Sequence, residues 1–205
     1  YLGDSEQPRL RAFIACREGF LHLHLSNNRQ ALNAFMEAEK GLMDIGPKAG
    51  LKDFYIKTLV LSGLGDLYER LDEKGKSLEA YRSVLPIVEK YQLRPRLAWH
   101  YLNAGRAALA RNEAEQAHLF FETVLRVVGV GDLEAKTHAL SNLGILAMLD
   151  GQFVRALNLF GQAAAQYDPP AKPVDFTNLS KIENWRAGIF LQLEDAKQAE
   201  LHLKK

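Results

Sequence analysis

The feature of this sequence that most restricts its fold is a spacing pattern that occurs five times. A glycine is followed twelve residues later by a small residue and sixteen residues later by an aromatic residue; the weaker fifth copy has alanine and leucine at the ends. A recurring period of this kind indicates a chain built from stacked repeats. The five copies are Gly19, Ala31 and Phe35; Gly65, Ser77 and Tyr81; Gly105, Ala117 and Phe121; Gly144, Ala156 and Phe160; and Ala187, Ala199 and Leu203.

Between these anchors, apolar residues recur at spacings of three and four. Ala31, Leu32, Phe35 and Ala38 are an example, and this period is that of an amphipathic helix rather than of a strand. A glycine in one helix would let its backbone approach the small residue of the next helix, and the aromatic residue would fill the space beside them. The sequence therefore predicts an all-α chain of about ten helices. Turns are expected at 26–28, 46–47, 72–75, 94–95, 112, 129–132, 150–151 and 168–173, where helix-breaking and capping residues gather.

The anchors resemble the signature of the tetratricopeptide repeat, in which a small residue of the first helix is followed by alanine and an aromatic residue in the second. This resemblance covers nearly the whole chain and implies a right-handed superhelical solenoid of about five antiparallel helix pairs. Successive small anchors are 46, 40, 39 and 43 residues apart, whereas the standard repeat has 34. Repeats of this length resemble those of kinesin light chains and bacterial peptide-sensing regulators. The expected repeats are about 8–46, 50–92, 94–129, 132–168 and 174–205.

The end of the chain suggests that the fifth repeat is truncated. Its second helix is expected to begin near Asp195 and to stop at Lys205, about one turn short of its counterparts. A terminal repeat normally has a polar outer face, and Leu201 and Leu203 do not fit one. Because the sequence also lacks an initiator methionine, we expect a fragment of a larger protein.

Composition restricts the classes of partner. Lys and Arg total 26 and Asp and Glu total 25, so no bulk charge attracts nucleic acid or a membrane surface, and neither is expected as a partner. The only local concentration of basic residues is interpreted as a solvated or partner-facing patch; it consists of Arg94, Arg96, Arg106 and Arg111. The single cysteine, Cys16, allows no internal disulfide and favours a reducing compartment, which predicts a cytoplasmic location.

The sequence offers no convincing enzymatic or metal chemistry. Gly75-Lys76-Ser77 copies the end of a phosphate-binding loop, but Arg70 stands where that loop requires glycine. His22 and His24 are two residues apart and so lie on different sides of a helix, which makes them poor joint metal ligands. Cys16 lacks the histidine pattern of a nucleophile and is interpreted as a buried hydrophobic residue. We therefore predict no catalytic residues, no metal and no cofactor.

In the tetratricopeptide family the first helices of successive repeats line a concave groove that holds a peptide or a partner helix. The resemblance places Trp99, Leu102, Asn103 and Arg106 on this face in the third repeat and His138, Ser141, Asn142 and Ile145 in the fourth. The two asparagines offer a donor and an acceptor to a peptide backbone, although polar residues on a hydrated helix face are the alternative. The second repeat adds Leu59, Ser62, Asp66, Glu69 and Arg70, and the first adds Phe13, Arg17, Phe20 and His24.

These expectations support two hypotheses for function. The first is a non-enzymatic scaffold that binds a protein or peptide and serves as the sensor or assembly segment of a larger regulatory protein. The second is a self-association module, in which the groove or an exposed end of the stack packs against its own copy and forms a homodimer.

Overall fold

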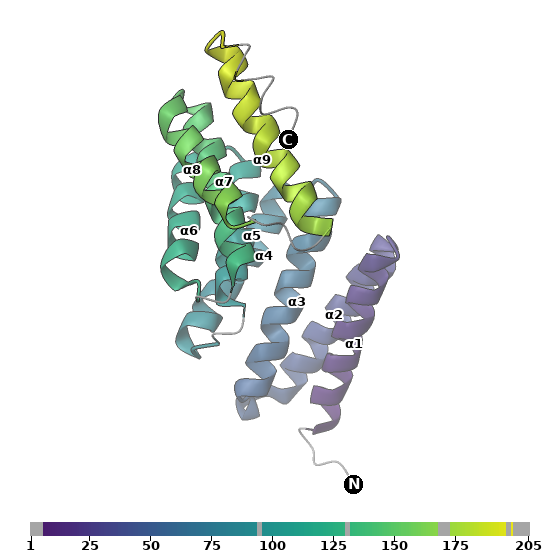
Figure 1. The fold of residues 1–205 in the computed structure, drawn as a ribbon. Coiled ribbons are helices and arrows are strands. Elements are labelled where there is room, and N and C mark those ends of the chain that lie inside the picture. The colour runs from purple at the N-terminus through teal and green to yellow at the C-terminus, as the bar shows by residue number, and fades with distance from the viewer. Residues whose placement is uncertain (1–5, 94–95, 130–131, 168–172, 196–197, 199–205) are drawn as a thin grey trace. The chain divides into compact units, whose positions relative to one another are not determined.

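The computed structural model describes residues 6–93, 96–129, 132–167, 173–195 and 198 (Figure 1). All regular structure in these ranges is helical and no strand occurs in them, which confirms the all-α prediction. The predicted turn at Arg94 and Pro95 and the anchors Ala199 and Leu203 lie outside the described residues. The helices are α1 (Glu6–His24), α2 (Asn28–Ile45), the short 3-10 helix η1 (Gly46–Lys48), α3 (Leu51–Arg70), α4 (Lys74–Lys90), α5 (Leu97–Ala110), α6 (Ala114–Val127), α7 (Leu133–Leu149), α8 (Phe153–Ala165) and α9 (Pro173–Gln192).

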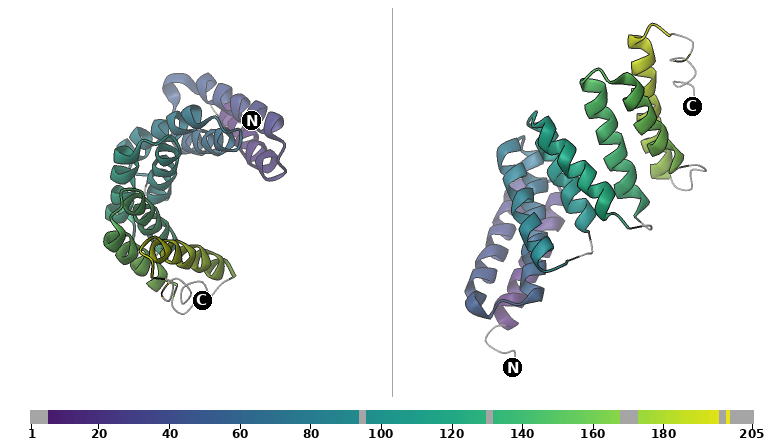
Figure 2. Two further views of the ribbon diagram at one scale, coloured as in Figure 1. Left: turned by 90° about the horizontal axis from the view of Figure 1, so that it is seen from above. Right: turned by 90° about the vertical axis from the view of Figure 1, so that its left-hand side faces the viewer.

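The chain forms two compact units, which we call unit 1 (Tyr1–Asn112) and unit 2 (Glu113–Lys205). Within unit 1, each helix packs on the next, and α1 also contacts α3. Within unit 2, the same order holds from α6 to α9, and α7 also contacts α9. Antiparallel neighbours such as α7 and α8 lie side by side in both views of Figure 2. The unit boundary falls inside the third predicted repeat, at the turn between α5 and α6.

The anchor glycines make room for aromatic rings. A Cβ atom on Gly19 of α1 would lie 2.5 Å from the ring of Phe35, which is completely buried. The same ring occupies the space beside Gly63 of α3, so Phe35 lies between two glycines of neighbouring helices. The sequence analysis expected each glycine to let the small anchor residue of the next helix come close. In the structure, the space beside the glycine is filled by the aromatic residue four positions after that small residue. Gly65 faces Tyr81 and Gly144 faces Phe160 in the same way.

The turns that end the odd-numbered helices share one backbone conformation. In each of these turns, the residue seven positions after the first anchor of the repeat has a positive φ. In four of these turns the following N–H donates to a carbonyl five residues back, as from Asn27 to His22 at 2.8 Å, a pattern of left-handed helix caps. The positive-φ residues are Ser26 (φ 59), Asp72 (φ 57), Asn112 (φ 60), Gly151 (φ 71) and Glu194 (φ 59).

Candidate functional site

The candidate site is the exposed stripe along α1, α3 and α5 of unit 1. The predicted groove positions of each helix follow one another at spacings of three or four residues and therefore lie on one face of that helix. Hydrogen bonds join these helices side by side: the Ser62 hydroxyl of α3 lies 3.3 Å from His100 Nδ1 of α5. The stripe has one hollow near the start of α3 and another near its end.

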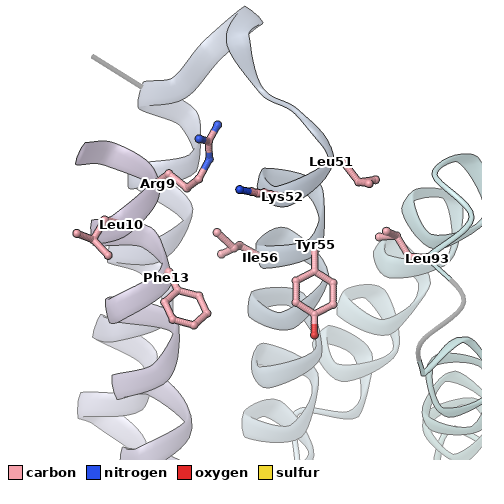
Figure 3. A pocket seen from close by; sticks show the side chains of 8 residues that line it. All are labelled: Arg9, Leu10, Phe13, Leu51, Lys52, Tyr55, Ile56 and Leu93. Carbon is pink, nitrogen blue, oxygen red and sulfur yellow. The ribbon is translucent and has the colours of Figure 1, made fainter. Parts of the chain in front are cut away.

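The first hollow, which we call the apolar hollow, has a volume of about 690 Å³. Figure 3 shows Phe13 of α1 and Ile56 of α3 extending into the space between their helices. Four of its large side chains remain exposed to solvent: Leu10 by 47%, Phe13 by 42%, Leu51 by 57% and Tyr55 by 41%. The hollow therefore offers apolar surface that remains exposed among the residues of unit 1 that the structure describes. Its lining is Arg9, Leu10, Phe13, Leu51, Lys52, Tyr55, Ile56 and Leu93.

An ion pair holds the wall of the apolar hollow in place. Arg9 of α1 donates from Nε to Asp53 Oδ1 at 2.6 Å and from Nη2 to Oδ2 at 2.9 Å. Asp53 also accepts the backbone N–H of Gly50 at 2.8 Å and so caps α3. The hydrogen bond from Arg9 lowers the pKa of the Asp53 carboxyl below its ordinary value, and the N–H of Gly50 contributes. The Arg9 guanidinium is therefore already paired with Asp53, whereas Lys52 has no ion-pair partner among the described residues.

The second hollow, the charged hollow, has a volume of about 340 Å³. Arg106 of α5 pairs with Glu69 of α3 at 3.3 Å, and both side chains remain about half exposed. Arg70 donates to the carbonyl oxygen of Leu23 at 2.7 Å, close to the end of α1, where cations are favourable. The two guanidinium groups are therefore held by different partners. The lining is Phe20, Leu23, His24, Asp66, Glu69, Arg70 and Arg106.

Asp66 is positioned by the helix behind it. Its Oδ1 accepts a hydrogen bond from the Tyr81 hydroxyl of α4 at 2.5 Å. Burial raises the pKa of the Asp66 carboxyl, and burial followed by the charge of Asp66 raises the pKa of Tyr81. A carboxylate has acceptor capacity beyond one hydrogen bond, so Asp66 can still accept from a ligand in the charged hollow.

The structure brings together part of the predicted groove. Asp66, Arg70 and Arg106 line the charged hollow, together with three further predicted positions, Phe20, His24 and Glu69. Trp99 and Asn103 lie on α5 and are half-buried.

Leu102 of α5 and Ser141 of α7 were also predicted on the groove face but are buried, at 1% and 6% exposure. His138 and Asn142 lie on α7 in unit 2. Asn142 Nδ2 donates to the carbonyl oxygen of His138 at 2.7 Å, and His138 Nε2 lies 3.9 Å from Glu134. One N–H of this amide is therefore already used within its own helix. A ligand-binding role stays a prediction for all of the predicted groove residues, including those that line the charged hollow.

Sequence analysis missed most of the apolar hollow. It placed Phe13 on the groove face but began the second repeat's positions at Leu59, one turn beyond Tyr55. Leu51 and Tyr55 are four residues apart on a helix that is apolar on its buried side too, so periodicity alone did not separate exposed from buried positions. Leu93 follows α4 and comes close to the hollow only through folding.

Other chemistry receives little support in the described part of the chain. No group of three or more potential metal ligands occurs there, and none of its helices is long and apolar enough to cross a membrane. Cys16 is fully buried, and burial raises the pKa of its thiol to about 11, which disfavours the reactive thiolate. The ammonium group of Lys76, in the first turn of α4, pairs with Glu73, the residue that precedes the helix.

Comparison with known proteins identifies the fold. No protein-family model matches the sequence, and no curated protein matches it. The chain is similar in structure to BtubC (BKLC) from P. vanneervenii, at 19% identity and a TM-score of 0.70 over 99% of this chain and 89% of that one. A putative kinesin light chain with TPR-like repeats from Podosopora anserina matches at 13% identity and a TM-score of 0.70, over 100% and 94% of the two chains. Pseudomonas aeruginosa pilF matches at 14% identity and a TM-score of 0.52, over 98% and 90%. The chain therefore has an all-α, tetratricopeptide-like repeat fold, as predicted.

Proposed function

We propose that this chain is a non-enzymatic protein-interaction scaffold that binds a peptide segment or a helix of another protein on the stripe of α1, α3 and α5. The observation that carries the proposal is the pair of hollows on that stripe. One exposes large apolar side chains and the other presents charged and hydrogen-bonding groups. Apolar anchoring beside a few polar groups that set orientation is the usual composition of a binding site.

The spacing of the two hollows suits a short segment of chain. Phe13 and Phe20 mark the two hollows on α1 and are seven residues apart, which corresponds to about 10 Å along a helix. Tyr55 and Asp66 mark them on α3 and are eleven residues apart, or about 16 Å. About three to five residues of extended peptide cover that distance. A segment of this length can place an apolar side chain in one hollow and a polar group in the other.

The tetratricopeptide-like fold and the near-neutral charge support the finer parts of the proposal. Similar structures include one described as a putative kinesin light chain, and 26 basic against 25 acidic residues favour a protein partner over nucleic acid. Within this proposal the chain serves as the cytoplasmic sensor or assembly segment of a larger regulatory protein. The predicted groove residues Trp99, Asn103, His138 and Asn142 are further candidates for contact with the ligand.

A peptide selection tests the proposal. A library of random twelve-residue peptides would be displayed on phage and selected on the chain, and affinities of the selected peptides would be measured by fluorescence anisotropy. We expect Phe13→Ala and Tyr55→Ala to weaken binding at least 30-fold, because aromatic anchors in interfaces commonly lose about 2 kcal/mol or more on truncation. Arg106→Ala and Asn103→Ala test the polar part of this stripe, and Asn142→Ala separately tests the predicted position on α7.

The matched control is Met36→Ala, because Met36 is a large exposed residue, at 57%, on the even-numbered helix α2. It should leave affinity unchanged. Circular dichroism verifies that every variant remains folded. Selected peptides that bind the Phe13→Ala and Tyr55→Ala variants with parental affinity would place the contact elsewhere and refute the proposal.

A further inference from the structure

A further exposed surface of unit 1 is an apolar stripe on α1 that we call the leucine stripe; it borders the apolar hollow, with which it shares Leu10. It consists of Leu10, Ile14, Leu21 and Leu25, which are exposed by 47%, 47%, 57% and 60%. Their spacings of four, seven and four residues place them along one side of the helix. Leu25 continues that side beyond the helix end, since its N–H donates to the carbonyl oxygen of Leu21 at 3.0 Å.

The leucine stripe faces away from the core of unit 1. The residues of α1 that pack into this core include Ala12, Ala15 and Cys16, all nearly or fully buried. At about 100° per residue, Ile14 and Leu21 lie on the opposite side of the helix from this set. Folded monomers seldom leave large contiguous apolar patches in water, so a row of four such side chains indicates a contact surface.

Two opposite charges flank the middle of the stripe. Arg17 and Glu18 are both exposed, and neither has an ion-pair partner among the described residues. As consecutive residues they lie about 100° apart, one on each side of the stripe between Ile14 and Leu21. Arg11, which is also exposed, lies on the same edge as Glu18, two turns nearer the start of the helix. At the level of Arg17 and Glu18 the surface is apolar along its centre, with a cation on one edge and an anion on the other. This local pattern is complementary to itself under one particular symmetry.

That symmetry is a two-fold axis parallel to the helices. It places each side chain of the stripe against the same residue of the second helix and brings opposite edges together, so that a cation meets an anion on both sides. An antiparallel pairing would instead bring each edge against the same edge and place like charges together. Closed two-fold symmetry is also the most common arrangement of identical subunits.

We propose that the leucine stripe is the interface of a parallel two-fold dimer with a second copy of this chain. Ile14 and Leu21 pack against the same residues of the second copy, and Arg17 pairs with Glu18 of the partner subunit on each edge. The interface is small compared with the roughly 20 to 30 residues a side of stable complexes, so the dimer forms reversibly in the micromolar range.

Sedimentation equilibrium over a range of concentrations measures the dimer. The parent chain should change from monomer to dimer as its concentration rises from about 1 to 200 µM, the range around a micromolar dissociation constant. Leu21→Asp should abolish association, whereas Met36→Asp on α2 should leave it unchanged. A parent that stays monomeric throughout this range overturns the proposal and leaves the stripe to another partner.

Charge exchange and cross-linking test the orientation. Arg17→Glu and Glu18→Arg should each weaken the dimer at least tenfold, and the double variant should restore it, because the exchange recreates both pairs. In a Cys16→Ala background, Leu21→Cys should form a disulfide dimer with itself. A disulfide that forms only between Ile14→Cys and Leu21→Cys chains would show the antiparallel arrangement and overturn the proposal. Ile14, Glu18 and Leu21 line neither hollow and are not predicted groove positions, so their variants should keep peptide binding and separate the two proposals. Arg17 is a predicted groove position, and its variants are left out of that comparison.

Discussion

His100 is a buried titratable residue in the interior of unit 1. Its ring is 7% exposed and Nδ1 lies 3.3 Å from the Ser62 hydroxyl. Burial, together with the charge of Arg96, lowers the pKa of His100 from 6.5 to about 4. Because the folded pKa lies below the unfolded one, the unfolded chain takes up the proton first as the pH falls. Stability is therefore unaffected above about pH 6.5 and decreases between pH 6.5 and 4.

We predict that His100 costs the parent on the order of 3 kcal/mol of unfolding free energy between pH 6.5 and 4. His100→Gln, which does not titrate, should lose much less over the same interval. Urea unfolding of both proteins at pH 7 and pH 4 measures the difference. The raised pKa of Asp66 acts in the opposite direction, but it is common to both proteins and cancels in the comparison. Equal pH dependence of parent and variant would contradict the prediction.

Gly144 tests the contact between an anchor glycine and its ring. A Cβ atom there would lie 2.7 Å from Phe160, which is fully buried and cannot move aside. Gly144→Ala should destabilise by about 1 to 3 kcal/mol through overpacking. Gly161 in α8 has nothing within 4 Å of its Cβ position, so Gly161→Ala should stabilise by about 0.5 to 1 kcal/mol. Urea denaturation should move the two midpoints in opposite directions; a shared direction would contradict the packing assignment.

At the scale of elements, the turns after the odd-numbered helices repeat one backbone conformation, although their residue types differ. Their left-handed position is filled by serine, aspartate, asparagine, glycine and glutamate in turn, and only glycine adopts this conformation without strain. The position is constant because the helix must end at the same distance from the anchor glycine for its partner helix to pack against the same ring. Turn geometry therefore follows from helix packing in this chain.

This interpretation predicts opposite effects for two substitutions. Gly151→Ala places a Cβ atom at a φ of 71° and should destabilise by about 1 to 2 kcal/mol. Ser26→Gly relieves the same strain at a φ of 59° and should stabilise by several tenths of a kcal/mol, less than the strain itself because glycine adds freedom to the unfolded chain. Thermal unfolding followed by circular dichroism measures both. A destabilising Ser26→Gly would show that its side chain matters more than its φ.

At the scale of the whole molecule, stability depends on contacts between near neighbours. Within each unit, the main contacts of a described helix are with helices one or two positions away in the chain. Repeat proteins of this kind have stabilities that are close to sums over repeats and their neighbouring contacts. A local defect should therefore remain local.

We predict that truncating one aromatic anchor loosens only the helices around it. Phe160→Ala removes a fully buried ring from the cluster of α7, α8 and α9, and Phe35→Ala removes one from the cluster of α1, α2 and α3. Each should cost about 3 to 5 kcal/mol locally. Hydrogen exchange followed by mass spectrometry should show faster exchange in α7–α9 for the first variant and in α1–α3 for the second. Uniform acceleration in both units would instead indicate a single cooperative fold.

The sequence by itself determined the helical class, the repeat register and the burial of the anchors. Phe35, Phe121 and Phe160 were identified by their spacing and are fully buried. Sixteen residues after the anchor glycine, a helical chain lies beside that glycine again only if it has turned back in an antiparallel helix. The aromatic side chain at this position is therefore enclosed between the two helices. The resemblance to tetratricopeptide repeats placed Asp66, Arg70 and Arg106 on one face, and all three line the charged hollow.

Only the tertiary structure decided what lies between the helices. The second glycine against Phe35, Gly63, belongs to the next repeat, and its role depends on how closely α3 approaches α1. The apolar hollow unites Phe13, Tyr55 and Leu93, which are far apart in the chain, and its volume depends on the distance between helices that packing sets. Spacing along a chain specifies which side of a helix a residue occupies, whereas the separation of two helices is a balance of all the side chains between them.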